Sequence, residues 1–306
     1  MLNNANNCGR ALLGICIGGF WSMSAGTAMK LVPSESVPKA VAILNGGAAL
    51  SSTIVAPLGS YLGSIIGWRG AFFCVVPIAA ISFIWQWFSV PKLPILPIQK
   101  SRSQIVNVLK LMTNPVVALG MISTMLLFIG QFSLFTYLRR LLETVTKVNI
   151  EVLSLILLTM GISGLLGTFL IGYLINNRMY SLLILMPFLM TLTVILLILF
   201  GSSLIIVFIL ITIWGFLSTA APTAWWIWLS KILPDEAETG GGLMVAIMQL
   251  AITMGAGIGG IIFDRSGYSN TFVFSTLILI AAAITAFITW FVHGKLFLFS
   301  SEVQAT

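Results

Sequence analysis

The sequence predicts an all-α membrane protein with about nine transmembrane helices. Of its 306 residues 58% are hydrophobic and only 8% are charged, and the mean hydropathy is +1.08. Soluble proteins carry about 25% charged residues, so this deficit indicates that lipid surrounds most of the chain. The apolar residues run continuously and do not alternate, which favours helices over membrane-spanning strands.

Nine apolar runs are close to the length of about 20 residues that crosses a bilayer. They lie at 10–31, 39–66, 70–90, 115–138, 152–175, 180–200, 203–230, 240–263 and 270–293. The first begins at Arg10 with regularly spaced glycines, and the second contains a proline, Pro57, among several glycines. The region 180–230 admits other divisions. A cleaved signal peptide is a weaker reading of the first run, because similar runs continue along the whole chain.

The longest polar connector, PKLPILPIQKSRSQIVNVLK, follows the third run and is the best domain boundary in the sequence. If the segments at 30–39, 92–110, 178, 231 and 295 share one side of the membrane, that side holds nine Lys and Arg residues and the other side six. By the positive-inside rule the richer side is cytoplasmic. The scattered basic residues form no stripe, so the net charge of +7 does not predict nucleic-acid binding.

An internal repeat links the two halves. Gly59, Gly67, Trp68 and Phe72 recur as glycine, glycine, tyrosine and phenylalanine 200 residues later, and KLVPSE at 30–35 resembles KILPDE at 231–236. Such a period predicts two homologous helical bundles. Three spans precede the matched part of the second bundle and none precedes it in the first. We therefore expect three further helices to belong before Arg10 in a twelve-helix protein.

This interpretation divides the chain into four parts. Residues 1–91 form an incomplete N-terminal bundle equivalent to helices 4–6, residues 92–114 a cytoplasmic linker, residues 115–295 a C-terminal six-helix bundle, and residues 296–306 a C-terminal tail.

Several motifs carry a family likeness. RALLG from Arg10, followed by GGFW from Gly18, resembles the fourth-helix motif of the major facilitator superfamily. The stretch from Pro57 through Trp68 to Phe72 looks like the fifth helix and following loop of its bacterial drug:proton antiporter branch. The resemblance implies a major facilitator helical bundle with three helices of the N-terminal bundle and six of the C-terminal one. It also implies proton-coupled efflux of small organic molecules, purine nucleosides or drugs, by alternating access. The stretch at 167–178 and Ala56 depart from the branch's patterns.

Two groups of residues are candidates for the functional site. Small, bending or charged residues that line helix seams or couple transport are Arg10, Gly14, Gly18, Pro57, Gly59, Gly63 and Asp264. Polar and aromatic residues that can bind a flat substrate are Trp21, Asn45, Gln131, Tyr137, Trp225, Trp226 and Gln249. Ordinary packing explains the glycines equally well, and snorkelling to the headgroups explains Arg10. We assign Trp228 to the interfacial aromatic belt.

No Asp or Glu lies inside a predicted span, although a proton-coupled carrier needs a titratable group there. We expect that carboxylate in the helices before Arg10, or else Asp264 reaching inward. A transport-incompetent remnant is the alternative function, and a channel is a weaker one. The sequence predicts no enzyme and no cofactor beyond the proton gradient. The expected partners are the lipid bilayer, a small-molecule substrate and protons, and the expected state is a monomer in the bacterial inner membrane.

Overall fold

The structure is a computed structural model of the 306-residue chain, and it describes residues 61–89, 110–233 and 236–305. Nine other residues are described singly: Cys16, Phe20, Gly47, Leu50, Ser51, Ile54, Val55, Leu58 and Gly59. Every regular element in the described ranges is a helix, which confirms the predicted all-α class.

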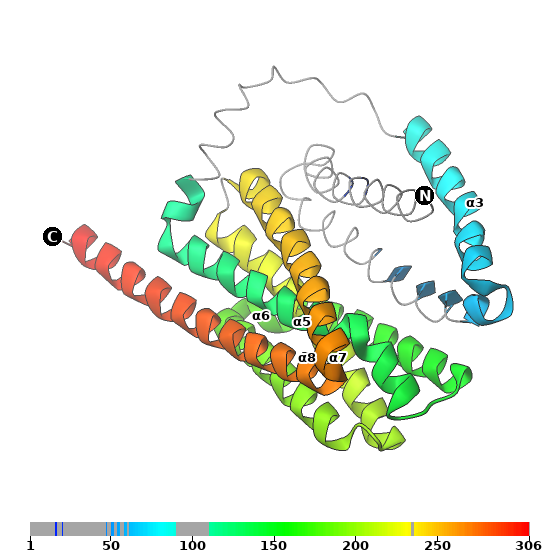
Figure 1. Cartoon of the computed structure of the whole chain (residues 1–306). Coiled ribbons are helices and arrows are strands. Elements are labelled where there is room, and N and C mark those ends of the chain that lie inside the picture. The colour runs from blue at the N-terminus through cyan, green and yellow to red at the C-terminus, as the bar shows by residue number, and fades with distance from the viewer. Residues whose placement is uncertain are drawn as a thin grey trace.

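Five helices, labelled as in Figure 1, make up most of the described chain. Their bounds are α3 Gly67–Ser89, α5 Pro115–Thr144, α6 Ile150–Phe200, α7 Leu204–Ile232 and α8 Ala237–Ala305. Each is apolar and long enough to cross a membrane at least once. The predicted runs from 70–90 and from 115–138 onward therefore coincide with helices.

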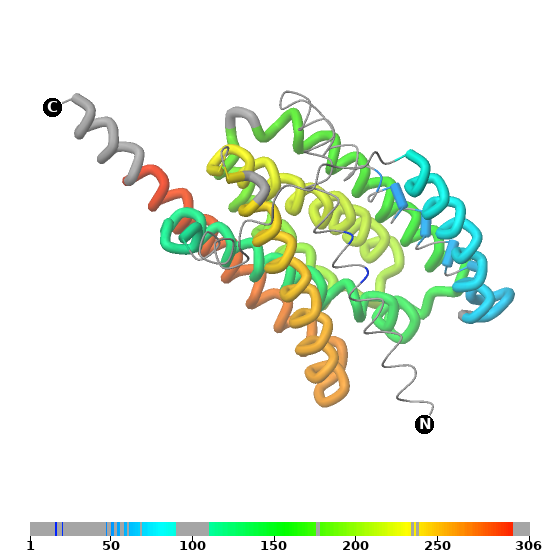
Figure 2. Tube along the Cα trace, turned by 90° about the horizontal axis from the view of Figure 1, so that it is seen from above, coloured from blue at the N-terminus to red at the C-terminus, as the bar shows by residue number. Residues whose placement is uncertain are grey.

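Two of these helices contain a break, and each is long enough to cross a membrane twice. In α6 the backbone leaves the helical region at Arg178, with φ −135° and ψ 35°. In α8 it does so at Gly267, inside an apolar stretch of 57 residues from Thr239 to Lys295. At 1.5 Å per residue that stretch is about 85 Å long, far more than the bilayer core of about 30 Å. Figure 2 shows the chain reversing direction between the two halves of α8. The total of nine helices stays a prediction, because 10–31 and most of 39–66 lie outside the described residues.

The helix starts follow local chemistry. Asn114 caps α5 by accepting a hydrogen bond from the Val116 amide at 3.0 Å, and Pro115 occupies the first helical position, where no amide donor is needed. Asn149 caps α6 in the same way, accepting from the Val152 amide at 2.9 Å. These caps set where two of the spans begin after their connectors.

The helices from α5 to α8 form one bundle, in which most of the close packing lies between α5 and α8 and between α6 and α7. Helix α5 packs mainly on α8 and α7 packs mainly on α6, whereas the backbones of α5 and α7 approach closely at only a few positions. The packed pairs approach closely at glycines. A Cβ atom at Gly255 would lie 2.6 Å from the Ile129 carbonyl oxygen, and one at Gly215 would collide with the Met160 carbonyl oxygen. Small residues thus let the backbones touch, as is common in membrane bundles.

Hydroxyl groups join the packed pairs. Each donates to a backbone carbonyl of the neighbouring helix at 2.6–2.9 Å. The four bonds are Ser123 to Ala282, Ser275 to Gly130, Ser163 to Thr212 and Thr219 to Gly164. In hydrocarbon these bonds satisfy the hydroxyl groups that water would otherwise solvate.

The outer surface of the bundle is apolar. Large side chains such as Phe169, Leu199 and Ile205 are 66–74% exposed. In contrast, the buried polar side chains of the described residues are Ser and Thr hydroxyls. This distribution suits a protein surrounded by lipid, in which exposed apolar groups lose nothing by facing acyl chains.

The backbone supports the internal repeat. Gly67 has φ +74° and Gly267, 200 residues later, has φ +79°. Each precedes an aromatic residue in the first turn of a helix. The two halves therefore share a glycine-dependent turn at the position where the repeat aligns them. Their surroundings differ, because Phe72 is 68% exposed whereas its counterpart Phe272 is fully buried in the bundle.

Contacts between helix ends show which basic residues share a side. The ring of Tyr180 contacts that of His293, 5.1 Å between centroids, and Thr146 bonds to the Gly201 carbonyl at the opposite end. Among the described residues from 110 to 295, each end then carries four Lys or Arg: Lys110, Arg178, Lys231 and Lys295 at one, Arg139, Arg140, Lys147 and Arg265 at the other. The predicted orientation thus depends on basic residues outside the described ranges and stays a prediction.

We expect Gly267→Ala to lower the free energy of unfolding by about 1–3 kcal/mol, because φ +79° with ψ 179° is open almost only to glycine. Thermal unfolding of the purified chain in detergent, followed by circular dichroism, measures the change. Gly294→Ala is the matched control, since a Cβ there would meet no atom within 4 Å and the residue is helical. Equal thermal unfolding midpoints for the two variants would contradict the conclusion that the backbone at residue 267 requires glycine.

Candidate functional site

Several predicted site residues lie outside the described residues: Arg10, Gly14, Gly18, Trp21, Asn45 and Pro57. Gly59 and Gly63 are described, and a Cβ atom at either would meet no described atom within 4 Å. The close helix packing predicted at these two glycines is therefore not seen among the described residues, and the seam they were expected to form stays a prediction.

Gln131 lies near the middle of α5, where the sequence predicted that its amide would need a partner. Its Nε2 donates to the Ser218 carbonyl of α7 at 3.1 Å. Its Oε1 is buried and accepts no hydrogen bond. The predicted partner therefore exists for one half of the amide, and the other half has no partner among the described residues.

Pro222 explains why the Ser218 carbonyl is open to Gln131. In an α-helix this carbonyl would accept from the backbone amide four residues later, but that residue is Pro222, inside α7, and proline has no N–H. The Gln131 amide takes the place of the missing donor. The Gln131 side chain of α5 thus supplies the hydrogen-bond donor that Pro222 of α7 lacks, near the middle of both helices.

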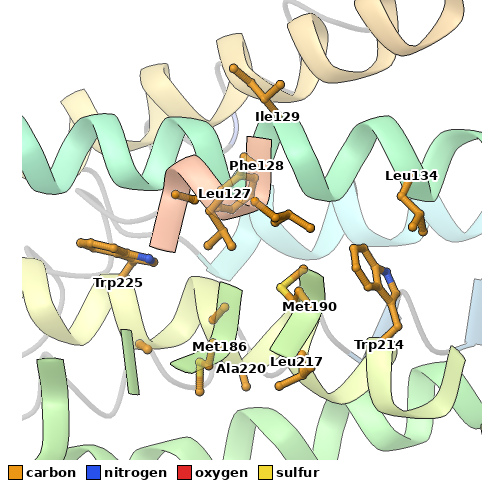
Figure 3. Packing of buried hydrophobic residues seen from close by; sticks show 14 of the residues in the cluster. Leu127, Phe128, Ile129, Leu134, Met186, Met190, Trp214, Leu217, Ala220 and Trp225 are labelled. Atoms are coloured by element: carbon orange, nitrogen blue, oxygen red, sulfur yellow. The ribbon is translucent and has the colours of Figure 1, made fainter. Parts of the chain in front are cut away.

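Trp214 is a second unpaired polar group on the same side of α7. It precedes Ser218 by four residues, its side chain is fully buried, and its Nε1 donor has no acceptor. Figure 3 shows it facing Leu134 of α5, three residues beyond Gln131. Trp214 is not among the residues that the sequence predicts for the site, because nothing in the local pattern separates it from the other tryptophans.

Tyr137 marks one end of the α5–α8 contact. Its hydroxyl donates to the Ala256 carbonyl at 3.0 Å, and its ring stacks on Phe263 with 4.9 Å between centroids. A Cβ atom at Gly260 would come within 2.5 Å of the Tyr137 oxygen. The tyrosine is therefore a packing residue of this seam as well as a substrate candidate.

The tryptophans near the end of α7 form a buried aromatic cluster. Trp225 is 1% exposed and meets Trp228 edge to face at 5.1 Å, while Trp226 is half-buried. The assignment of Trp228 to the interfacial belt is wrong. Its ring is fully buried, it lies against Gly120 of α5, and its Nε1 donates to the Tyr180 hydroxyl at 3.4 Å. Tertiary packing covers a ring that sequence position alone would leave at the surface.

Two other candidates occupy different surroundings. Gln249 is half-buried in α8, and its side chain makes no hydrogen bond with the described residues. Asp264 and Arg265 are both exposed just before the break at Gly267. The structure thus does not turn Asp264 into the bundle core. The described candidates are spread along the bundle, with Gln131 between Tyr137 near one end and Trp225 near the other.

Comparison with known proteins gives this architecture a family. The model of the Major Facilitator Superfamily matches residues 8–252. The chain belongs to the major facilitator superfamily. It is accordingly a multi-pass membrane protein of a transporter family, and this confirms the resemblance seen in the sequence motifs.

Curated relatives match most of the chain. The transcription regulatory protein OpdE of Pseudomonas aeruginosa is 47% identical over 281 residues, which is 92% of this chain and 70% of the relative. The purine ribonucleoside efflux pump NepI of Escherichia coli O157:H7 is 37% identical over 277 residues, 90% of this chain and 69% of the relative. NepI of Salmonella enteritidis is 36% identical over 276 residues, with 90% and 68% coverage. The chain thus spans about 70% of the length of these relatives.

The compensation between Gln131 and Pro222 is testable by a double-mutant cycle. We expect Gln131→Leu to reduce the free energy of unfolding by about 1–2 kcal/mol, because it leaves the buried Ser218 carbonyl unpaired. In a Pro222→Ala background residue 222 can donate to that carbonyl, so the cost should fall by about 1 kcal/mol. Unfolding in mixed micelles with increasing SDS measures all four proteins.

The control cycle pairs Pro222→Ala with Gln86→Leu, because Gln86 is exposed on α3. The changes in the free energy of unfolding caused by these two substitutions should be additive. Additivity of the Gln131 and Pro222 changes as well would show that the two residues do not compensate for each other.

Proposed function

We propose that this protein exports small organic molecules, with purine nucleosides as the first candidate class, by alternating access coupled to the proton gradient. The observation that supports the proposal most is the likeness, at 36–37% identity over about nine-tenths of the chain, to proteins named as purine ribonucleoside efflux pumps. Membership of a transporter family supports transport in general.

The surroundings of Gln131 agree with this proposal. Substrate sites of transporters lie near the bilayer midplane, and Gln131 is near the centre of its span. A nucleoside is a flat, polar and uncharged molecule, so it needs hydrogen-bonding groups and aromatic faces more than it needs ions. The amide of Gln131 and the aromatic rings of Trp214 and Trp225 are groups of this kind.

The α7 helix is a candidate for the moving part. Pro222 removes one backbone hydrogen bond from its interior, and its backbone comes close to that of α5 at only a few positions. Packing against α6 through Gly215 is much closer. We propose that α7 moves with α6 and that the contact with α5 loosens when the substrate enters or leaves.

The proton-coupling group remains part of the proposal. Asp264, the carboxylate that the sequence singles out, is exposed at the end of the first half of α8. Of the described residues, we propose Asp264 as the candidate for carrying the proton. We also propose the division at residues 91, 114 and 295, a monomeric state and the bacterial inner membrane as the location.

A second candidate function comes from the relative OpdE, whose name describes regulation and not transport. This relative, at 47% identity, supports a second proposal, in which the protein influences gene expression. A transport-incompetent remnant and a channel also compete with the exporter. All three rivals differ from an exporter in the same measurable way, since none moves a nucleoside against its gradient.

An active exporter should lower the accumulation of labelled adenosine or inosine in cells that express this chain, relative to cells with an empty vector. A protonophore should remove the difference, because the export is proposed to depend on the proton gradient. Uptake of the labelled nucleoside over time, with and without protonophore, is the measurement.

Equal accumulation with and without the protein would contradict export. A gradient-independent flux in liposomes that contain the purified chain would indicate a channel. Unchanged nucleoside levels together with an altered transcript profile in the host strain would favour a regulatory role.

A further inference from the structure

The Gln131 side chain can present only one group to a ligand. Its partner in α7, the Ser218 oxygen, is a carbonyl and therefore an acceptor, so the amide must point its NH₂ group toward it. This bond fixes the orientation of the amide, whose oxygen and nitrogen ends are otherwise nearly alike in shape. The remaining group is the Oε1 atom, a buried acceptor without a donor.

The Trp214 side chain presents the opposite group. An indole nitrogen only donates, and this one is buried without an acceptor. Trp214 and Ser218 are four residues apart and share one face of α7, and Figure 3 shows Trp214 directed toward Leu134, one turn beyond Gln131 on α5. An unpaired acceptor on α5 and an unpaired donor on α7 thus lie in neighbouring turns of two helices that meet at the Gln131–Ser218 bond and at Leu134 and Trp214.

The neighbouring side chains make these two groups unusual. Leu127, Leu134 and Leu217 are buried hydrophobic residues of the same layer, seen together in Figure 3. They offer neither donor nor acceptor. Burying a polar group without a partner is costly, and most such groups in native proteins have a partner or a function. A molecule with one donor and one acceptor on the same edge would satisfy both.

We infer that Gln131 Oε1 and Trp214 Nε1 read the hydrogen-bonding edge of a neutral heteroaromatic base. The base must carry an exocyclic amine as donor and a ring nitrogen beside it as acceptor, as adenine does. The amine donates to Gln131 and the ring nitrogen accepts from Trp214. This inference depends on the proposed function, because it assigns a recognition mode to the nucleoside site.

Entry to this site requires α5 and α7 to separate. Both groups are closed off from the surface in this structure. The backbones of the two helices approach closely at only a few positions, and the Gln131–Ser218 bond joins them. A base that approaches Oε1 therefore meets a glutamine already held in place, with its acceptor directed by α7.

The experiment compares adenosine with purine riboside, which has the same ring and sugar but no exocyclic amine. The full chain in lipid nanodiscs is titrated with each labelled nucleoside by scintillation proximity. We expect adenosine to bind at least about tenfold more tightly, because purine riboside leaves the buried acceptor unpaired. Gln131→Met should abolish this difference. Trp214→Phe should weaken both ligands about five- to tenfold and keep their ratio, since both carry the ring nitrogen.

Matched control variants are Gln86→Met and Trp290→Phe, whose side chains are exposed on α3 and α8. Both should leave the two affinities unchanged. Gln131→Met is also made in the Pro222→Ala background, in which the Ser218 carbonyl regains a backbone donor. The loss of discrimination should persist there, whereas a loss that came from a disturbed fold should be repaired.

Three outcomes would overturn the inference in different ways. Equal binding of the two nucleosides to the unchanged chain would refute base-edge recognition and leave the proposed function intact. An equal loss for both ligands in Gln131→Met, with their ratio kept, would reduce Gln131 to a structural role. Binding of neither nucleoside would remove the proposed function and the inference with it.

Discussion

The requirement that every polar group find a partner inside the protein governs this structure. Hydrocarbon offers no hydrogen bonds, so the backbone is helical throughout the described spans and the buried hydroxyls donate to carbonyls of neighbouring helices. The same requirement explains the contact between Gln131 and Ser218, which replaces a donor that Pro222 lacks. The glutamine of α5 therefore supplies the hydrogen bond that the proline of α7 cannot make.

Close approach of the helices follows from a second constraint, the absence of a hydrophobic force between helices in lipid. Contact depends on packing and hydrogen bonds, and both need the backbones to be near each other. Gly215 and Gly255 allow this on the two main seams, where α7 meets α6 and α5 meets α8. Between α5 and α7 the backbones lie farther apart and larger side chains fill the space, and the proposed site lies there.

The site residues show the limits of sequence patterns. Gln131 was identifiable because an amide in the middle of an apolar run needs a partner. Trp214 was not, because a tryptophan in such a run is equally suited to lipid, to an aromatic belt or to a core. Trp228 was placed wrongly for the same reason, since its position near Lys231 matches a belt residue while Gly120 and Tyr180 in fact enclose it. Which neighbour faces an aromatic ring depends on how helices pack, and no pattern along one helix contains that information.

The helical class, the spans from residue 70 onward, the family and the repeat of 200 residues could all be predicted from the order of the amino acids, and Gly67 and Gly267 reproduce that repeat in the backbone. These features depend on local hydrophobicity, on residue order and on the conformations open to glycine, all of which are properties of short segments. The assembled bundle alone shows that α5 packs on α8 and α7 on α6, that Gln131 bonds to the carbonyl that Pro222 leaves free, and that an acceptor on α5 and a donor on α7 remain unpaired. Those features join residues that are far apart in the chain, 87 positions in the bond from Gln131 to Ser218, and their energies exist only when the helices are assembled.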